Sequence, residues 1–325
     1  MNASLAALEP GLQAGGQVPL VSIVIPTYRR PTLLAEAIAS ALGQDSADDY
    51  EVLVLDNDAE ATAPFSAEVV AASFQDPRLR YVRNAKNLGM TGNWNRGLEV
   101  ARGTWMTLLH DDDLLYPGFL EGVLPLFDRS DLITCRVAVG SSPPSVGAAR
   151  SNHRKAQAHR LHESDLAFSN VSPAPGIIFR RAAALHLGGF REAWYPCADY
   201  DFWIRYVTHC RAWSVPEILA FYRIQDNESL QTTTRIQMAE KAALLQKDLV
   251  ERLMPRTPWR HFVAAAGVQS LLQHYCKDPL FRDSEELAVF SKQVGFRPGS
   301  PRWWIKFRLS LAKRLLRWTP RGVVS

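Results

Sequence analysis

The chain has 325 residues, with 37 Lys and Arg against 33 Asp and Glu and a formal net charge of +4. This near balance excludes a dedicated nucleic-acid binder, because such proteins carry a large excess of positive charge. Hydrophobic residues make up 47% and charged residues 22% of the chain, which excludes disorder throughout and predicts a sizeable core. The number of domains stays open at this length.

The N-terminal segment does not resemble a targeting signal. Residues 1–20 have no Lys or Arg ahead of their apolar residues and include Glu9 and Pro10, whereas a secretory signal begins with a basic region. We therefore expect a loose leader over residues 1–20 and a cytoplasmic protein. No apolar run approaches the roughly 18 residues needed to span a bilayer. The four cysteines contain no CxxC pair, which suits reduced thiols.

From Val21 onward, short apolar runs alternate with amphipathic stretches. The runs VSIVIP, EVLVLD, RLRYV and TWMTLLH have strand character, and helical stretches follow the first two. This alternation predicts an α/β fold with a Rossmann-like, mostly parallel sheet flanked by helices. Because ligands bind beyond the carboxyl ends of such strands, residues 26–30, 56–58 and 110–113 are the candidate binding segments.

The second half of the chain divides into three parts. Residues 141–160 are rich in Ser, Pro, Gly and basic residues and predict a mobile loop. The segments GIIFRR, ADYDFWIRYV, RAWSV and EILAFYR then resume strand and helix patterns, so we expect the α/β domain to span residues 21–230. Beyond Leu230 apolar residues recur every three or four positions, which predicts an all-helical region over residues 231–325.

Three consecutive carboxylates, Asp111, Asp112 and Asp113, follow the TWMTLLH run. Two like charges about 4 Å apart in a partly buried site repel by about 4 kcal/mol at an effective dielectric of about 20, so solvent, protonation or a cation must offset them. Oxygen ligands on a short turn suit Mg²⁺ or Mn²⁺, which complete their coordination with substrate phosphates. The other interpretation is a solvated acidic turn that caps the next helix.

These segments together resemble the family 2 inverting glycosyltransferases with the GT-A fold, over roughly residues 21–230. VSIVIPTYRRPTLL is similar to the first strand and nucleotide-binding loop of that family, and EVLVLDND to its second strand. RNAKNLGMTGNWNRGLEVARGTWMTLLHDDDLL is similar to its asparagine-glycine loop, helix and metal-binding segment. The resemblance implies a nucleotide-diphosphate sugar donor, with Asp56 at its base. The residues placed at the donor are Pro26, Thr27, Tyr28, Arg30, Asp56, Asn87, Gly89, Asn95, Gly97 and Asp111.

The resemblance also implies a bound Mn²⁺ or Mg²⁺. Asp112 stands at the family's main metal-binding position, and Asp113 is expected to support the residues that bind the metal. His110 replaces the family's usual first Asp. It could be a metal ligand, a hydrogen-bond donor to a phosphate, or simply a polar residue at the end of a strand.

GIIFRR, GGF and ADYDFWIRY resemble the family's acceptor-side segment, in which an acidic residue before a Trp-containing helix is the general base. The resemblance assigns this role to Asp199. The base takes a proton from the acceptor hydroxyl as that oxygen attacks the anomeric carbon opposite the leaving nucleotide diphosphate. One carboxylate is enough, because a divalent ion neutralises the leaving group. The other interpretation of Asp199 is a helix N-cap.

Departures from the family pattern bear on catalysis. Ala198 stands where the family has Glu, which removes a neighbouring carboxylate that could orient the base or raise its pKa. Gln225 stands where a metal-binding or phosphate-contacting His is common, and this second departure weakens the case for metal dependence. Arg223 could meet a phosphate or form a surface salt bridge. A catalytically silent member that binds nucleotide sugar or membrane is therefore the alternative hypothesis. A dinucleotide-dependent oxidoreductase is disfavoured, because no GxGxxG follows the first strand.

The last predicted helix is basic and amphipathic. Residues 297–321 contain no Asp or Glu, and helical spacing places Trp303, Phe307, Leu311, Leu315 and Trp318 on one apolar face. This pattern suits an interfacial helix on an anionic inner membrane, where a glycan or lipid-linked glycan acceptor for surface polysaccharide assembly would be presented. Packing of this face on the catalytic domain is the main alternative. Nucleic acid is not expected as a partner.

Overall fold

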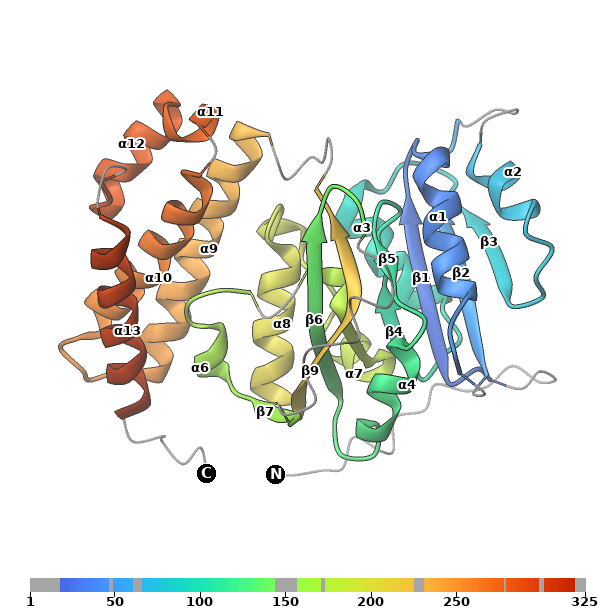
Figure 1. Ribbon diagram of the computed structural model, residues 1–325, viewed down its shortest axis with the longest axis horizontal. Coiled ribbons are helices and arrows are strands. Elements are labelled where there is room, and N and C mark those ends of the chain that lie inside the picture. The colour runs from blue at the N-terminus through green and yellow to red at the C-terminus, as the bar shows by residue number, and fades with distance from the viewer. Residues whose placement is uncertain are drawn as a thin grey trace. The chain divides into compact units, whose positions relative to one another are not determined.

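The computed structural model describes residues 18–46, 49–60, 66–143, 157–170, 173–224, 231–277, 279–297 and 301–318. These residues form two compact units (Figure 1). The first unit comprises the described parts of Met1–Leu161, Ser172–Glu192 and Arg205–Gln225, and the second comprises those of His162–Val171, Ala193–Ile204 and Asp226–Ser325. The division falls within helix α8 (Ala198–His209).

The first unit contains a mixed sheet. Its strands are β1 (Val21–Thr27), β2 (Tyr50–Asp56), β3 (Leu79–Arg83), β4 (Trp105–Leu108), β5 (Leu114–Leu115), β6 (Leu132–Gly140), β7 (His159–Leu161), β8 (Ile177–Arg180) and β9 (Ala212–Arg223). The strand order is β3-β2-β1-β4-β8-β6-β9-β5, and β7 also pairs with β9. The main helices are α1 (Pro31–Leu42), α2 (Ala67–Ala72), α3 (Gly89–Val100), α4 (Phe119–Val123) and α7 (Arg181–His186).

The parallel half of the sheet is covered on both faces. β1 pairs in parallel with β2 and β4, and β2 pairs in parallel with β3. Because side chains alternate along a strand, Ile23 and Ile25 share one face with the buried residues of α1. Val24 points to the other face, where a Cβ added to Gly97 of α3 would lie 3.1 Å from its side chain. Burial on both faces explains why β1 and β2 consist of continuous apolar runs.

The other half of the sheet is mostly antiparallel. β8 runs antiparallel to both β4 and β6, and β5 and β7 run antiparallel to β9, whereas β6 and β9 are parallel. The runs RAWSV and EILAFYR form the single strand β9 although Pro216 lies between them. Proline has no N–H to donate, and the β6–β9 register shifts between Thr134 and Val137, where β9 carries the extra residues.

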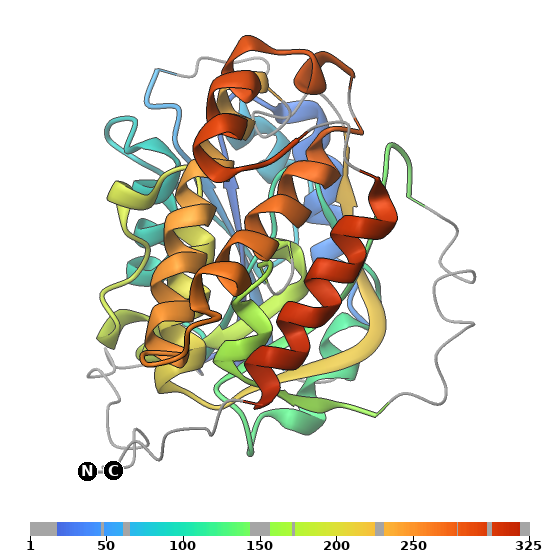
Figure 2. The same cartoon turned by 90° about the vertical axis from the view of Figure 1, so that its left-hand side faces the viewer.

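The second unit is helical. Its main helices are α6 (Glu163–Leu166), α9 (Thr232–Leu253), α10 (Arg260–Tyr275), α11 (Pro279–Arg282), α12 (Glu285–Val294) and α13 (Arg302–Trp318). α10 packs against both α9 and α13 (Figure 2). Ala239, Leu272 and Phe290 lie in the shared core. Ser284 caps the start of α12 by accepting from the Leu287 N–H at 3.3 Å, and Gly295 ends this helix with a left-handed φ of 63°.

The α/β sheet flanked by helices and the helical C-terminal region confirm the fold class expected from the sequence. The expected mostly parallel sheet is wrong in this detail, because β8, β5 and β7 pair antiparallel with their neighbours. The domain boundaries placed at residues 20 and 230 stay a prediction. The leader prediction falls almost entirely on residues 1–17, and the mobile-loop prediction largely on residues 144–156, all of which lie outside the described residues. Among the described helices, none combines the length and the apolar character that a bilayer span requires.

Gly103, just before β4, provides a test of the close contact between β1 and β4. Its N–H donates to Ser22 Oγ at 2.7 Å, and a Cβ at this position would lie 2.5 Å from the Ser22 nitrogen and 2.7 Å from the Trp105 oxygen. Backbone atoms in paired strands cannot move away independently. We expect Gly103→Ala to destabilise the protein by about 2 kcal/mol, which lowers the melting temperature by about 4–8 °C. Gly140→Ala is the matched control, because its Cβ would make ordinary contacts at 3.6 Å. Equal melting temperatures for the two variants would contradict the described strand contact.

Candidate active site

An acidic turn, His110–Asp113, lies beyond the carboxyl ends of the parallel strands. It follows β4 directly, and β1 and β2 end at the same edge of the sheet, at Thr27 and Asp56. The Asp113 N–H donates to the His110 carbonyl at 3.1 Å, which closes the turn, and β5 then pairs with β9. The side chains of Asp111, Asp112 and Asp113 are all buried. The alternative of a solvated acidic turn is therefore wrong.

The loop after β1 supplies two partners for the buried carboxylates. The Thr27 hydroxyl donates to Asp111 Oδ2 at 2.7 Å. Arg30 Nη1 donates to Asp112 Oδ2 at 2.7 Å and lies 3.8 Å from Asp111 Oδ1. A charge-assisted hydrogen bond of this length is strong, so Arg30 offsets part of the repulsion within the acidic turn. Thr27 and Arg30, both assigned to the donor from sequence, thus contact the acidic turn.

Arg223, the last residue of β9, clamps the acidic turn from the other side. Its N–H donates to Asp113 Oδ1 at 2.9 Å, and its Nε donates to the Asp112 carbonyl at 2.9 Å. Its Nη2 donates to Glu36 Oε2 of α1 at 2.6 Å. The arginine is buried while its partner Glu36 is exposed, so the suggested salt bridge forms, but with a buried cation that also contacts the acidic turn. Its guanidinium ties α1, β9 and the acidic turn together.

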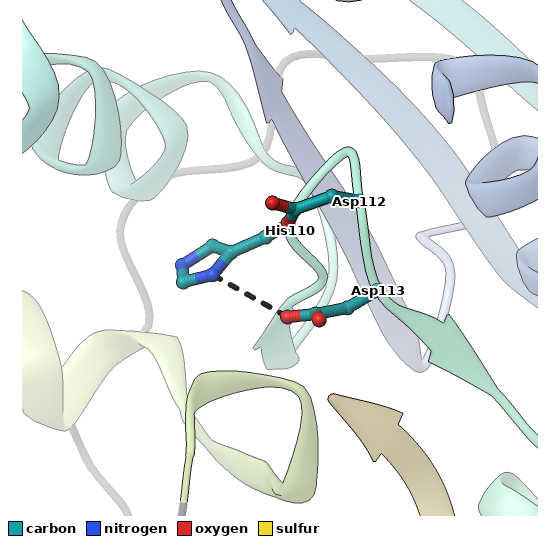
Figure 3. A group of neighbouring side chains, drawn as sticks. All are labelled: His110, Asp112 and Asp113. Atoms are coloured by element: carbon teal, nitrogen blue, oxygen red, sulfur yellow. Dashed lines mark ion pairs between the residues drawn. The ribbon is translucent and has the colours of Figure 1, made fainter. Parts of the chain in front are cut away.

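His110 points toward Asp113. Its Nδ1 lies 3.5 Å from Asp113 Oδ2, and Figure 3 shows both side chains and that of Asp112 projecting from the same turn. The imidazole stacks on the Trp94 indole of α3, with ring centroids 5.6 Å apart and planes 14° from parallel. Trp94 also makes an edge-on contact with Phe190. The stack holds the ring in one orientation.

The charged groups of the acidic turn and their burial shift the pKa values of its side chains. Burial lowers the pKa of His110, but the contact with Asp113 and the three carboxylate charges outweigh it and raise this pKa to about 9. Burial raises the pKa of Asp111 to about 6, although the Thr27 hydrogen bond and the Arg30 charge oppose the rise. Burial also raises the pKa of Asp113. Near neutral pH the imidazole therefore carries a proton and partly neutralises the acidic turn.

The acidic turn has a donor set that fits a divalent cation. His110, Asp112 and Asp113 each offer one ligand atom, and these atoms lie within 4.8 Å of one another. Among the described residues, buried His110 Nε2 has no hydrogen-bond partner, and buried Asp113 Oδ2 has the 3.5 Å ion-pair contact with His110 Nδ1 but no hydrogen bond. Such atoms are costly unless another group satisfies them. Two carboxylates and one imidazole are suitable ligands for Mn²⁺ and related ions. A cation here would compete with the proton on His110.

A buried amide network, which the sequence did not reveal, supports the loop before α3. Asn57 Nδ2 donates to Asn87 Oδ1 at 2.8 Å and to the Gly89 carbonyl at 3.2 Å, and Asn57 Oδ1 accepts from the Leu88 N–H at 2.9 Å. Asn84 Nδ2 donates to Asn57 Oδ1 at 3.0 Å. Asn57 lies within the candidate segment 56–58, and the same rule that ligand-binding loops follow parallel strands could have identified Asn84 after β3.

The predicted donor residues of the first loop differ in exposure. The Pro26 side chain is buried within β1, whereas the Tyr28 ring is exposed, with the Arg29 guanidinium 5.0 Å from its centroid. Arg29 has a left-handed φ of 58° and pairs with Asp58 at 2.9 Å. A non-glycine residue in this region is strained, and the ion pair compensates. Tyr28 is thus the open aromatic surface of this loop.

The remaining predicted donor residues have structural partners. Asp56 is buried and accepts from the Asp58 N–H at 2.9 Å and the Tyr81 hydroxyl at 2.7 Å. Asn95 exchanges two hydrogen bonds of 2.8 Å with the Phe190 backbone. The close approach of Gly97 to Val24 gives that glycine a packing role. The donor contacts assigned to Asp56, Asn87, Gly89 and Asn95 stay predictions.

Asp199 lies in the second unit, in the first turn of α8 together with Asp201, so it is not the N-cap. Asn170 Nδ2 donates to Asp199 Oδ2 at 2.7 Å, and the Tyr200 N–H donates to Asp199 Oδ1 at 2.7 Å. A carboxylate is favoured at this end of a helix. Asp112 belongs to the first unit and Asp199 to the second, so the expectation that they face one cleft stays a prediction. Gln225 lies outside the described residues.

The amide network yields a test of the loop before α3. Asn57→Ala removes the acceptor of the Leu88 N–H and one of the two acceptors of the Asn84 amide, which keeps its hydrogen bond to Asn93 Oδ1. Unsatisfied buried groups cost about 1–3 kcal/mol, so we expect a fall of about 2 kcal/mol in the free energy of unfolding. Asn87→Ala is the control, because Asn87 is exposed and its loss frees fewer buried groups. Urea titration of both variants measures the free energy of unfolding. An equal loss of this free energy in the two variants would refute the central role of Asn57.

The sequence matches known glycosyltransferases. The model of "Glycosyl transferase family 2" matches residues 22–185. YwdF, an uncharacterized glycosyltransferase of Bacillus subtilis, is 27% identical over 213 residues, which are 64% of this chain and 77% of YwdF. The GalNAc(5)-diNAcBac-PP-undecaprenol beta-1,3-glucosyltransferase of Campylobacter jejuni is 34% identical over 108 residues, which are 33% of this chain and 34% of that enzyme.

A solved structure agrees with the fold. The mannosyltransferase PcManGT of Pyrobaculum calidifontis, solved with GDP-Man and Mn²⁺, matches with a TM-score of 0.54 at 17% identity, covering 93% of this chain and 88% of that one. This likeness concerns the fold alone, and it confirms the expected GT-A architecture with a helical C-terminal region. The match to the family model, which spans half of the chain, establishes that the chain belongs to glycosyl transferase family 2.

Proposed function

We propose that this chain is an inverting glycosyltransferase. It moves a sugar from a nucleotide-diphosphate sugar to the hydroxyl of a glycan or lipid-linked glycan acceptor. The observation that carries the proposal is the acidic turn: in a family 2 chain, His110, Asp112 and Asp113 cluster within 4.8 Å beside Arg30, beyond the carboxyl ends of parallel strands. PcManGT was solved in complex with the nucleotide sugar GDP-Man, and an undecaprenol-linked glycan appears in the name of the Campylobacter relative.

On the donor side, the chain supplies cationic and aromatic groups around the acidic turn. His110, Asp112 and Asp113 would hold Mn²⁺ or Mg²⁺, which when bound neutralises charge on a leaving diphosphate. The imidazole nitrogen favours Mn²⁺ over Mg²⁺, because Mg²⁺ sites are typically built from oxygen ligands. Arg30 lies close enough to Asp111 and Asp112 to add a second positive charge there. The exposed Tyr28 ring offers a surface on which a nucleotide base can stack.

On the acceptor side, Asp199 is the proposed base. Its carboxylate takes the proton of the acceptor hydroxyl while that oxygen bonds to the anomeric carbon, and the bond from this carbon to the diphosphate oxygen breaks with its electron pair leaving on the diphosphate. Attack from the opposite face inverts the configuration. Asn170 and the Tyr200 N–H hold the carboxylate in one orientation. Orientation of this kind is a large part of what a positioned base contributes.

The relatives also support a setting. A lipid-linked acceptor is embedded in a membrane, so we propose that the enzyme works in surface polysaccharide assembly at the cytoplasmic face of the cell membrane, as a peripheral protein. This setting accords with the finding that the described helices include none suited to crossing a bilayer.

Asp199→Asn tests the assignment of the base. We expect turnover to fall at least about 100-fold, because a positioned base contributes about 10²–10⁴-fold. The measurement is release of nucleoside diphosphate from a panel of nucleotide sugars with a glycan acceptor and Mn²⁺. Glu192→Gln, which changes an exposed acid shortly before α8, is expected to keep wild-type turnover. A wild-type enzyme that turns over no donor would favour the catalytically silent alternative, and unchanged turnover in the Asn variant would exclude Asp199 as the base.

Asp112→Asn tests the metal site independently of turnover. Loss of one carboxylate ligand is expected to weaken Mn²⁺ binding at least about tenfold, measured by calorimetry without donor. Asp76→Asn is the control, because Asp76 pairs with Arg78 before β3, at the opposite end of the parallel strands. Equal Mn²⁺ affinity in the wild type and the Asp112 variant would disprove cation binding by the acidic turn.

A further inference from the structure

Helix α13 carries two separate apolar rows. The inner row contains Ile305, Ala312 and Leu316, which are buried, and α13 packs on α10. These positions are spaced by seven and four residues, so they lie on one side of the helix. Ile305 is part of the core of the helical unit. The inner row therefore accounts for the attachment of α13 to that unit.

The outer row is exposed. Trp303 is 68%, Phe307 54% and Leu311 38% exposed, and Trp304 beside them is 43% exposed. Trp303, Phe307 and Leu311 are four residues apart and form one stripe, and the Trp304 and Phe307 rings stack with centroids 5.7 Å apart. The apolar face expected from the sequence contained this stripe. A different row is buried in the helical unit, and packing of the stripe on the catalytic domain stays a prediction.

The charge on this helix has one sign. No Asp or Glu follows Glu286 in the chain. Lys306, Lys313 and Arg314 are exposed on α13. Lys313 Nζ lies 5.8 Å from the centroid of the Phe168 ring, and the Arg308 guanidinium lies 5.2 Å from that of Phe262, so these two cations also help to hold the helix. Exposed aromatic side chains therefore alternate with unbalanced positive charge.

We infer that α13 binds an anionic phospholipid surface through its outer row. Trp side chains favour the boundary between headgroups and acyl chains, and Phe307 and Leu311 would insert beside them. Lys306 and Arg314 would lie at lipid phosphates, where a negative surface attracts basic side chains. A second copy of the chain is a poorer occupant, because two such helices would bring like charges together. The four exposed side chains of the outer row, Trp304 included, are also few for a stable protein interface.

This inference deepens the proposed peripheral location and rests on the proposed function only for its purpose, which is access to a lipid-linked acceptor. Vesicle binding can be measured without donor, acceptor or metal. A failure of vesicle binding would therefore leave the transfer reaction untouched, and a failure of the transfer reaction would leave vesicle binding standing.

The experiment is co-sedimentation of the full chain with vesicles of phosphatidylcholine alone or mixed with phosphatidylglycerol. We expect binding to the mixed vesicles, weakened by added salt, and at least about tenfold weaker binding to phosphatidylcholine alone. Trp303→Ser/Phe307→Ser is expected to weaken binding to the mixed vesicles at least about tenfold with an unchanged melting temperature, because both side chains are exposed. The matched control is Trp259→Ser, which removes another exposed tryptophan at the start of α10 and should bind like the wild type.

A charge pair completes the test. Lys306→Glu/Arg314→Glu is expected to weaken binding to the anionic vesicles, whereas Lys247→Glu on the exposed surface of α9 should weaken it much less. The inference is overturned if the wild type does not bind anionic vesicles, or if the Trp303 and Phe307 substitutions leave binding unchanged. It is also overturned if light scattering shows a dimer that these substitutions dissolve while vesicle binding is absent, because the outer row would then be a protein interface.

Discussion

The burial of three adjacent carboxylates on one turn is the constraint on which the first unit depends. Two like charges about 4 Å apart repel by about 4 kcal/mol at an effective dielectric of about 20. The chain offsets this repulsion with positively charged side chains from separate elements. Arg30 follows β1, Arg223 ends β9, and His110 lies in the acidic turn itself. Because these partners meet only in the folded sheet, correct strand order and assembly of the site depend on each other.

The same charge balance explains why a cation suits this edge of the sheet. The Arg223 guanidinium pairs with Glu36 and the backbone of the acidic turn. Among the described residues, Arg30 and the protonated His110 are therefore the nearest positive charges that balance the carboxylates. A donor diphosphate would add further negative charge to this edge. Binding it therefore favours more positive charge at the turn, and we propose that a divalent cation would supply it by displacing the His110 proton and binding His110 and Asp113.

The sequence predicts most of what depends on local pattern. Continuous apolar runs identify β1 and β2, and spacing identifies α9, α10, α12 and α13, because burial imposes these periods directly. The clustering of His110, Asp112 and Asp113 followed from their adjacency. The clamp by Arg223 could not be predicted, because it joins residues 110 positions apart. The antiparallel direction of β8 and the role of Asn57 likewise depend on tertiary pairing, which no single segment encodes.

Helix α13 shows the same limit in another form. Its apolar residues cover more than one side of the helix, and a pattern of this kind is typical of a helix that is buried all round or that contacts two apolar environments. Spacing alone cannot decide which row faces the protein. The structure assigns Ile305, Ala312 and Leu316 to the core and leaves Trp303 and Phe307 exposed. Exposed aromatic residues lower solubility unless they are buried in another apolar environment, such as the acyl chains of a membrane. The uniformly positive charge around them favours a membrane with anionic headgroups.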